Sequence, residues 1–233
     1  MKRLFLLMAV TLVALCGSIA TTNAQAPKRQ NWYGDSLYGN VESVTITEYE
    51  LQDKFGEVIR GDVQEKKKWR FNAAGDVIEI ASYNPDGSLD GKSIYKYDSS
   101  GNEVEYAWYN SDGSLDEKYI YKYDSSGNMI ERAEYDSAGS LVEKWICKYD
   151  SSGNMIEWAI YNSDGSLKEK KIYKYDSSGK MIEEAEYNSD GSLKRKDIYK
   201  YDSSRNIIEL TEYKSDALIP EYQAEVKIVY RNE

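Results

Sequence analysis

Apolar and aromatic residues occur in short segments of about eight residues, separated by glycine-containing turns. The segments are rich in Tyr, Ile and Trp, which is typical of β-strands rather than helices. The turns are of two kinds, exemplified by residues 124–127 (DSSG) and 110–113 (NSDG). Both place Asp or Asn first and Gly fourth, as in a type I turn followed by a left-handed residue. Pro85 agrees, because it stands second in its turn, where φ near about −65° is required. The pattern predicts β-hairpins.

The hairpins repeat with a period of 26 residues. The clearest marker is a tyrosine that follows Lys and opens the phrase YDSS in most units: Tyr97, Tyr123, Tyr149, Tyr175 and Tyr201, with Phe71 in the same place one unit earlier. Two glycine series share the period, one through Gly101 and one through Gly113. Because each repeat must stack on its neighbours, we predict an all-β fold: an elongated antiparallel hairpin meander, twisted or partly wound, of about 12–14 strands.

Turn length also predicts which residues lie opposite one another. The expected pairs are Tyr135 with Leu141, Ala133 with Glu143, Glu131 with Trp145, Met129 with Cys147, Tyr123 with Met129 and Tyr121 with Glu131. In this register one face carries nearly everything that recurs, including Trp145, and the other carries Ile130, Ile146, the lysines and the variable positions. We expect the recurring face to point inward, with its glutamates partly buried among tyrosine hydroxyls. These glutamates are Glu105, Glu131, Glu157, Glu183 and Glu209.

The phrase Tyr-Asp-x-x-Gly, followed by an x-x-Asp-Gly turn and Tyr-x-Tyr-Asp, resembles the YD repeat of the RHS family over residues 71–213. Residues 161–166 (YNSDGS) are also similar to the hairpins of MORN-type repeats. The resemblance implies a long sheet that winds into a shell, and related repeats are associated with carbohydrate binding. The unit here is longer and only about five or six are present, so we expect an open sheet.

The N-terminus predicts export. Basic residues precede an apolar run at residues 4–15, and small and polar residues follow, as in a secretory signal peptide over residues 1–24. Cys16 leaves an alternative, a lipoprotein signal with this cysteine acylated. The expected location is the periplasm, the exterior or the cell surface. The run is too short to span a bilayer, and no later segment approaches the required length.

The remaining boundaries follow from the repeat. We expect a flexible leader over residues 25–36, an N-terminal capping hairpin over 37–70, the hairpin repeats over 71–213 and a C-terminal capping strand over 214–233. In the N-terminal cap, a strand over residues 41–49 would be joined by a longer loop around Phe55 and Gly56 to a strand over 62–71.

Composition limits the chemistry. The chain has no His and two Cys, which excludes His-dependent triads, Cys-His nucleophiles and imidazole zinc sites. The net charge is −10, and residues 25–233, with 28 basic and 40 acidic side chains, carry −12. Such acidity disfavours nucleic acid as a partner. We expect no catalytic residues, no cofactor and no metal: the Asp-rich turns lack calcium-loop spacing, and Cys147 is interpreted as a neutral substitution at a packed tyrosine position.

Departures from the repeat are the candidate site. Tyr106, Trp108 and Trp158 are aromatic side chains at variable positions of one face, where they could stack on sugar rings or anchor a protein. The alternative is that they only fill gaps over the isoleucine stripe. The expected function is an exported, non-enzymatic repeat protein that binds a carbohydrate or an envelope protein. The alternative is a structural spacer that self-assembles edge to edge, and an enzyme ranks third.

Overall fold

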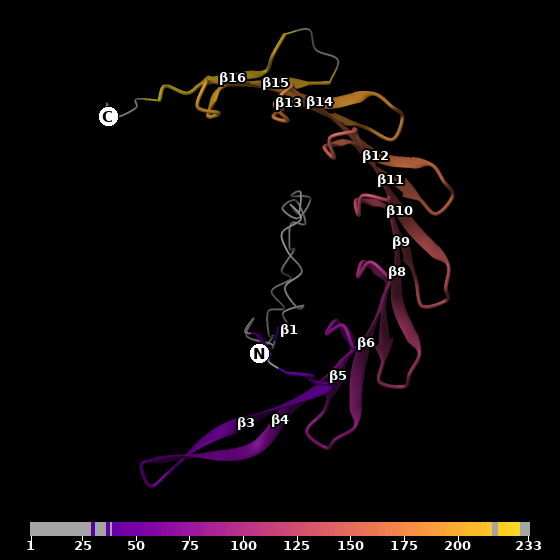
Figure 1. Cartoon of the computed structure of the whole chain (residues 1–233), viewed down its shortest axis with the longest axis vertical. Helices are drawn as coiled ribbons and strands as arrows, with labels where there is room; N and C mark the ends of the chain where they lie inside the picture. Colours follow the sequence, from indigo (N-terminus) through magenta and orange to yellow (C-terminus); the bar gives the residue numbers. More distant parts are fainter. Residues whose placement is uncertain (1–28, 31–35, 38, 216–218, 229–233) are drawn as a thin grey trace.

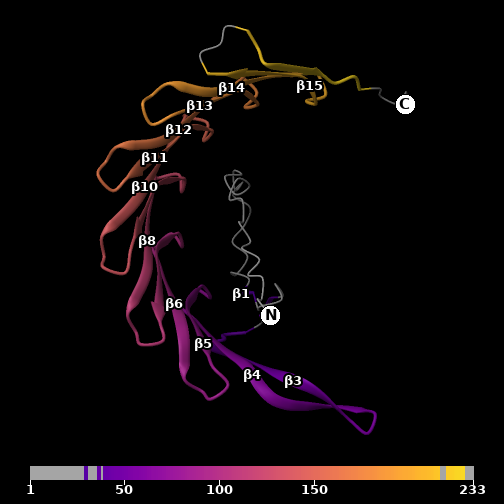
Figure 2. The same cartoon turned by 180° about the vertical axis from the view of Figure 1, so that it is seen from behind.

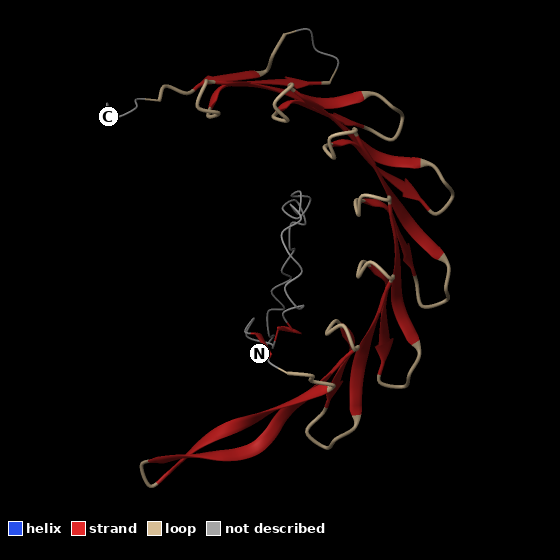
Figure 3. Ribbon diagram, in the orientation of Figure 1, coloured by secondary structure: helices blue, strands red, loops and turns tan. Residues whose placement is uncertain are grey.

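The computed structural model describes residues 29–30, 36–37, 39–215 and 219–228, and the predicted signal peptide with Cys16 lies outside them. The described residues form a 14-stranded antiparallel sheet whose strand order in space is the order in the sequence (Figure 1). This confirms the all-β hairpin meander. Strands and turns account for the sheet (Figure 3), and no described helix has the length and apolar character needed to cross a membrane.

Two very short strands, β1 (Arg29–Gln30) and β2 (Ser36–Leu37), pair with each other at the predicted leader. The 14-stranded sheet consists of β3 (Ser43–Lys54), β4 (Glu57–Phe71), β5 (Val77–Tyr83), β6 (Leu89–Tyr97), β7 (Glu103–Asn110), β8 (Leu115–Tyr123), β9 (Met129–Tyr135), β10 (Leu141–Tyr149), β11 (Met155–Asn162), β12 (Leu167–Tyr175), β13 (Met181–Tyr187), β14 (Leu193–Tyr201), β15 (Ile207–Lys214) and β16 (Tyr222–Glu225).

The sheet is a single layer curved into an open arc, seen from both sides in Figures 1 and 2. Turns of the Gly101 series lie toward the concave side of the arc, and turns of the Gly113 series lie on its outer side. Neither face is covered by another layer of the described chain. The expected inward-facing core is therefore not formed, and both faces are half-exposed.

The buried positions are small because a single layer can enclose little volume. The most deeply buried apolar residues of the described chain are the five alanines that recur at the middle of alternate strands, together with Phe71 and Cys147. These alanines are Ala81, Ala107, Ala133, Ala159 and Ala185, each at most 2% exposed. No large side chain of the described residues is fully buried. Side chains are instead covered by their neighbours along the same face, as cross-strand pairing allows.

The turns have the predicted geometry. In the turn at residues 124–127, the Gly127 amide donates to the Asp124 carbonyl at 3.1 Å, and Gly127 has φ of 84°. The Asp124 carboxylate accepts hydrogen bonds from the amides of Ser126 and Asn128 at 2.8 and 2.9 Å. The side-chain and backbone hydrogen bonds from Asn128 hold the pKa of Asp124 below its usual value. The turn aspartates thus act as caps. At the last turn Arg205 replaces glycine and still adopts φ of 73°.

The predicted register is correct beside the turns and wrong by one residue along the strands. Tyr135 lies opposite Leu141, as expected. Glu131, however, lies opposite Ile146 instead of Trp145. The cause is a β-bulge next to each turn, which places one extra residue on one strand and so moves the following side chains to the other face.

Bulges of the same kind also shift the register across the turns of the Gly101 series. Tyr123 lies opposite Met129, as predicted, but Tyr121 lies opposite Arg132 and not Glu131. Ala133 likewise lies opposite Lys144 instead of Glu143. The recurring residues are therefore divided between the two faces.

One face, which we call the Lys–Glu face, carries the Lys-x-Ile-x-Lys side chains of one strand and the Glu-x-Ala-x-Tyr side chains of the next. The recurring glutamates on it do not lie among tyrosine hydroxyls, contrary to expectation. Each glutamate forms an ion pair of 2.7–2.9 Å with the lysine that precedes a YDSS tyrosine: Lys96–Glu105, Lys122–Glu131, Lys148–Glu157, Lys174–Glu183 and Lys200–Glu209. The lysines are more than half exposed, so solvent screens each pair and its contribution to the free energy of unfolding is small.

The YDSS tyrosines join the two strands of each hairpin at its open end by a hydrogen bond from the side chain to the backbone. The Tyr123 hydroxyl donates to the backbone carbonyl of Glu103, twenty residues earlier, at 2.8 Å. Four equivalent bonds of 2.6–2.9 Å recur along the sheet: Tyr97 to Val77, Tyr149 to Met129, Tyr175 to Met155 and Tyr201 to Met181. Each accepting carbonyl belongs to the first residue after a turn, where the bulge has interrupted the backbone ladder. The hydroxyl therefore closes the open end of a hairpin.

The N-terminal hairpin differs from the prediction. β3 and β4 are 12 and 15 residues long and meet at a tight turn instead of a longer loop. Phe55 and Gly56 have φ of 59° and 85°, and two consecutive positive values are typical of a two-residue type I′ turn. The extra length makes this hairpin project well beyond the rest of the arc (Figure 1).

We predict that Tyr123→Phe lowers the free energy of unfolding by about 0.5–1.5 kcal/mol, because it removes only the hydroxyl that satisfies the Glu103 carbonyl. The matched control is Tyr109→Phe, since the Tyr109 hydroxyl has no hydrogen bond within the described residues. Urea unfolding followed by circular dichroism measures both. Equal midpoints for the two variants would contradict a stabilising role for the hydroxyl bond.

A candidate ligand-binding face

The second face, which we call the variable face, carries the Tyr-x-Tyr side chains and the positions that change most between units. Four positions of each unit vary there, and they adjoin one another across the strands. Each position can be followed through successive units at a spacing of 26 residues. The first is occupied by Ser93, Tyr119, Trp145, Lys171 and Asp197, and the second by Tyr106, Arg132, Trp158 and Glu184. The third is occupied by Trp108, Glu134, Ile160 and Glu186, and the fourth by Gly91, Glu117, Glu143, Glu169 and Arg195. Aromatic residues occupy some of these positions in the first three units, and every residue of the set from Glu169 onward is charged.

An aromatic band crosses β6 to β10 on this face. The Tyr106 ring lies between Tyr95 and Tyr119, with ring centroids 5.3 and 5.8 Å apart. The Arg132 guanidinium continues the band, 4.4 Å from the centroid of Tyr119 and 4.1 Å from that of Trp145. Such cation–π contacts hold the arginine between the two rings. Its Nε is buried and has no hydrogen-bond partner among the described residues.

Trp108 is seated on a glycine. A Cβ atom at Gly91 would lie 2.6 Å from the Trp108 indole, so the absence of a side chain makes room for the ring. Ser93 lies directly opposite Trp108 on β6, and Glu117 lies opposite it on β8. Glycine replaces the glutamate or arginine found at the equivalent position of later units. Two departures from the repeat, Gly91 and Trp108, therefore form one local arrangement.

The structure places all three predicted residues on the variable face and half-buried. Tyr106 and Trp108 lie together on β7, but Trp158 lies on β11, roughly 19 Å away at four strand spacings. Trp158 is opposite the buried Cys147 on β10 and Lys171 on β12. The three residues therefore share a face but do not form one cluster, and Trp158 lies one strand beyond the aromatic band.

Sequence reasoning missed the residues that connect them. The sequence prediction does not include Tyr119 and Arg132, and it puts Trp145 on the opposite face from the one observed. The bulges explain the error, because a strict alternation from the turn places Trp145 with Glu131. A usable signal was present in the sequence: Tyr106, Arg132 and Trp158 are spaced by the repeat, as are Tyr119 and Trp145.

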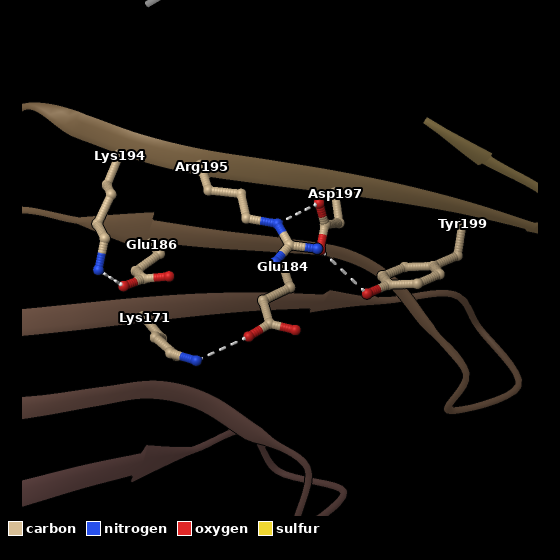
Figure 4. A network of polar contacts seen from close by, with 7 residues as sticks. All are labelled: Lys171, Glu184, Glu186, Lys194, Arg195, Asp197 and Tyr199. Atoms are coloured by element: carbon tan, nitrogen blue, oxygen red, sulfur yellow. Dashed lines mark hydrogen bonds and ion pairs between the residues drawn. The ribbon is translucent and has the colours of Figure 1, made fainter. Parts of the chain in front are cut away.

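The charged half of the variable face is internally paired (Figure 4). Asp197, whose side chain is 6% exposed, accepts hydrogen bonds from Arg195 at 2.8 and 3.0 Å and from the Tyr199 hydroxyl at 3.4 Å. Lys171 pairs with Glu184 at 3.2 Å, and Lys194 pairs with Glu186. Charges that satisfy one another are less available to a ligand than the rings of the aromatic half.

Burial keeps the tyrosines of this face protonated. It raises the pKa of Tyr119 to about 12, helped by the neighbouring charges of Glu117 and Glu134. It also raises the pKa of Tyr121 to about 12, with a smaller contribution from Glu103. Desolvation raises the pKa of Glu134 as well. These phenols, which are protonated at neutral pH in any case, therefore remain hydrogen-bond donors to a higher pH than an exposed tyrosine.

Two shallow grooves lie elsewhere, between successive turns of the Gly101 series. One has a volume of about 560 Å³ and is lined by residues such as Arg70, Asp76 and Lys96. The other, of about 760 Å³, occupies the equivalent place three units later, around Asn154, Lys174 and Asp176. Within the described part of the chain, no group of His, Cys, Asp and Glu side chains is arranged to hold a metal ion. Tyrosines line both grooves too, Tyr95 and Tyr97 in the first and Tyr173 and Tyr175 in the second. The aromatic band differs from them because its rings contact one another across neighbouring strands.

Residues 83–134 match a family described as a protein of unknown function, DUF2963. No curated protein matches the chain. Among solved structures, 84% of this chain aligns with 12% of a chain in the TcdB2-TccC3-Cdc42 structure, at 15% identity and a TM-score of 0.46. A porin-like protein from Bacteroides uniformis aligns over 82% of this chain and 85% of its own, at 10% identity and a TM-score of 0.34. This chain therefore spans about an eighth of the first of these proteins.

We predict that the free energy of unfolding falls as the pH rises from about 10 toward about 12, because tyrosines ionise near 10 when unfolded and near 12 at Tyr119 and Tyr121 when folded. Because the pKa of these tyrosines is higher in the folded state, their contribution to the free energy of unfolding is fully present at pH values below the unfolded pKa. It is lost as the pH rises through the folded pKa. Tyrosinate absorbance should therefore appear at higher pH in the native protein than in denaturing urea. Coincident titration curves would contradict the protection of these phenols.

Proposed function

We propose that the chain is an exported, non-enzymatic β-hairpin repeat protein that binds an extended ligand, and a carbohydrate in preference to a protein, on the aromatic half of the variable face. The observation that carries the proposal is the continuous row from Tyr95 through Tyr106, Tyr119 and Arg132 to Trp145. Rings held by neighbouring strands of a rigid sheet can stack on sugar faces with little loss of side-chain entropy.

Polar groups beside the rings suit hydroxyl-rich ligands. The Tyr119 hydroxyl donates to Glu117 at 3.1 Å, and the Ser93 and Tyr106 hydroxyls lie 3.5 Å apart. Carboxylates and phenols in this arrangement can exchange hydrogen bonds with sugar hydroxyls without a cofactor. The resemblance of residues 71–213 to RHS-type YD repeats supports the same proposal, since related repeats are associated with carbohydrate binding. The signal-peptide pattern of residues 1–24 supports export.

A structural role is the second candidate. Its support is the open single-layer sheet, whose end strands β3 and β16 each have one neighbour among the described strands. Unpaired strand edges can join further strands, and a curved array of this kind can span distance. In that case the aromatic band would serve only to cover the sheet.

The test is binding of the purified protein to a carbohydrate array, comparing the wild type with Trp108→Ala. We expect the variant to lose affinity about tenfold or more, because it removes an exposed-face indole from β7, the strand that also supplies Tyr106 to the band. Trp108→Phe keeps an aromatic face and should retain part of the binding. Circular dichroism verifies that each variant is folded.

The matched control is Tyr187→Ala, which removes an aromatic ring from the Lys–Glu face, where Tyr187 contacts Lys170. It should bind carbohydrate like the wild type. Equal losses in Trp108→Ala and Tyr187→Ala would argue against a site on the variable face. A wild type that binds no carbohydrate would remove this ligand class.

A further inference from the structure

The projecting part of the N-terminal hairpin has one largely apolar face. Both register irregularities between β3 and β4 place the extra residue on β4, so β3 keeps its regular alternation. Residues that lie opposite one another on paired strands share a face. One face, which we call the tip face, therefore carries the following side chains: Tyr49, Leu51, Asp53, Val58, Arg60 and Val63.

Apolar side chains of this part of the hairpin are exposed to water. Of the nine large hydrophobic side chains that are exposed in the described chain, four lie within residues 49–58. Leu51 and Val58 are 70% and 71% exposed, and Phe55 at the tip is 99% exposed. Figures 1 and 2 both show the hairpin leaving the arc, where no second layer of the described chain covers it. A group of exposed apolar side chains on a projecting element is typical of a contact site.

Two basic side chains adjoin the apolar ones on the same face. Thr45 and Thr47 continue the alternation of β3 from Tyr49, and Lys68 and Lys66 lie opposite them on β4. We call these two residues the hairpin lysines. Within the described residues, neither has a hydrogen bond or an ion pair. Their charges are therefore available to a partner.

Lys68 is also a departure from the repeat. Every later unit has isoleucine at this position: Ile94, Ile120, Ile146, Ile172 and Ile198. The first unit thus carries a positive charge where the others carry an apolar side chain. The opposite face of the hairpin is rich in acidic residues, which are Glu48, Glu50, Glu57 and Glu65. Positive and negative charges are therefore concentrated on different faces.

We propose that the tip face binds the surface of a lipid bilayer that contains anionic headgroups. Phe55 and the apolar side chains of the tip face enter the boundary between headgroups and acyl chains, while Arg60 and the hairpin lysines lie near the phosphates. Apolar side chains bordered by cations match a bilayer, in which acyl chains lie beneath negative charge. The acidic face points away from the membrane, where its charges stay in water.

The contact between Arg60 and Tyr49 agrees with this arrangement. The Arg60 guanidinium lies 5.2 Å from the centroid of the Tyr49 ring. Arginine and tyrosine both combine an apolar body with a polar end, so they suit the level of the headgroups. The proposal does not depend on carbohydrate binding. The hairpin lysines lie opposite Ala81 and Tyr83 on the Lys–Glu face, whereas the aromatic band lies on the variable face and begins at β6.

Cosedimentation of the purified protein with lipid vesicles is the first test. One set of vesicles is phosphatidylcholine alone, and the other contains about one third phosphatidylglycerol, which supplies the negative charge. We expect binding to the anionic vesicles to be about tenfold tighter or more, and to weaken as added salt screens the headgroups.

Phe55→Ser tests the apolar contact. It should weaken binding to the anionic vesicles about tenfold or more, because it removes the side chain that the bilayer buries most deeply. The fold should be unaffected, since this side chain is almost fully exposed. The matched control is Ile219→Ser, which removes another exposed apolar side chain beyond β15 and should bind like the wild type.

A pair of double variants tests the charge. Lys66→Gln with Lys68→Gln should weaken binding to the anionic vesicles and leave binding to the neutral ones unchanged. Lys54→Gln with Lys67→Gln makes the same change of net charge on the opposite face of the same hairpin, and its effect should be much smaller. Circular dichroism verifies that each variant is folded.

Four results would each overturn the proposal. They are a wild type that binds neither kind of vesicle, equal binding to both kinds, a Phe55→Ser variant that binds like the wild type, and equal losses in the two double variants. The first of these is also the result expected if the hairpin docks on a protein.

Discussion

The structure depends on the constraint that a single layer of strands must stabilise itself without a second layer against which to bury apolar side chains. Among the described residues, complete burial of hydrophobic side chains is therefore found at small residues such as Ala107 and Ala159, which have no exposed surface. The remaining stabilisation comes from contacts between adjacent strands. Lys–Glu pairs, lysine–tyrosine contacts and tyrosine hydroxyl bonds each join one strand to the next, and all recur with the repeat. The tyrosine content follows from this constraint, because a phenol covers apolar neighbours and also satisfies a carbonyl.

Much of the fold could be predicted from the sequence because local rules decide it. The spacing of Gly101 and Gly113 and the position of Pro85 fixed the turns, and sequential hairpins then gave the strand order. The faces could not be predicted, because bulges beside the turns are not visible in the pattern of residue types. One extra residue beside Met129 is enough to move Trp145 and Glu131 to opposite faces. The length of the N-terminal hairpin was missed because the Phe55–Gly56 turn lacks the Asn-Gly or Asp-Gly signal.

The candidate site shows the same division. Tyr106, Trp108 and Trp158 could be found from sequence as departures from the repeat, and they do share a face. Their partners could not, because the role of Arg132 depends on the rings of Tyr119 and Trp145 being on either side of it. The two faces divide structural and variable roles: the Lys–Glu face repeats nearly unchanged, while the variable face differs from unit to unit. A constant face leaves the other free to change without loss of the fold.

The bond from each YDSS tyrosine to a carbonyl twenty residues earlier has a consequence for how such a gene can change. Each strand of the sheet pairs only with its neighbours in the sequence, so removing or duplicating a 26-residue segment of the repeat region rejoins equivalent strand ends. Gain or loss of whole repeats by unequal recombination would thus lengthen or shorten the arc in whole steps, and each step would insert or delete a set of variable-face side chains. The number of units, and with it the length of the arc, can therefore change in evolution while the strand pairing between units stays the same.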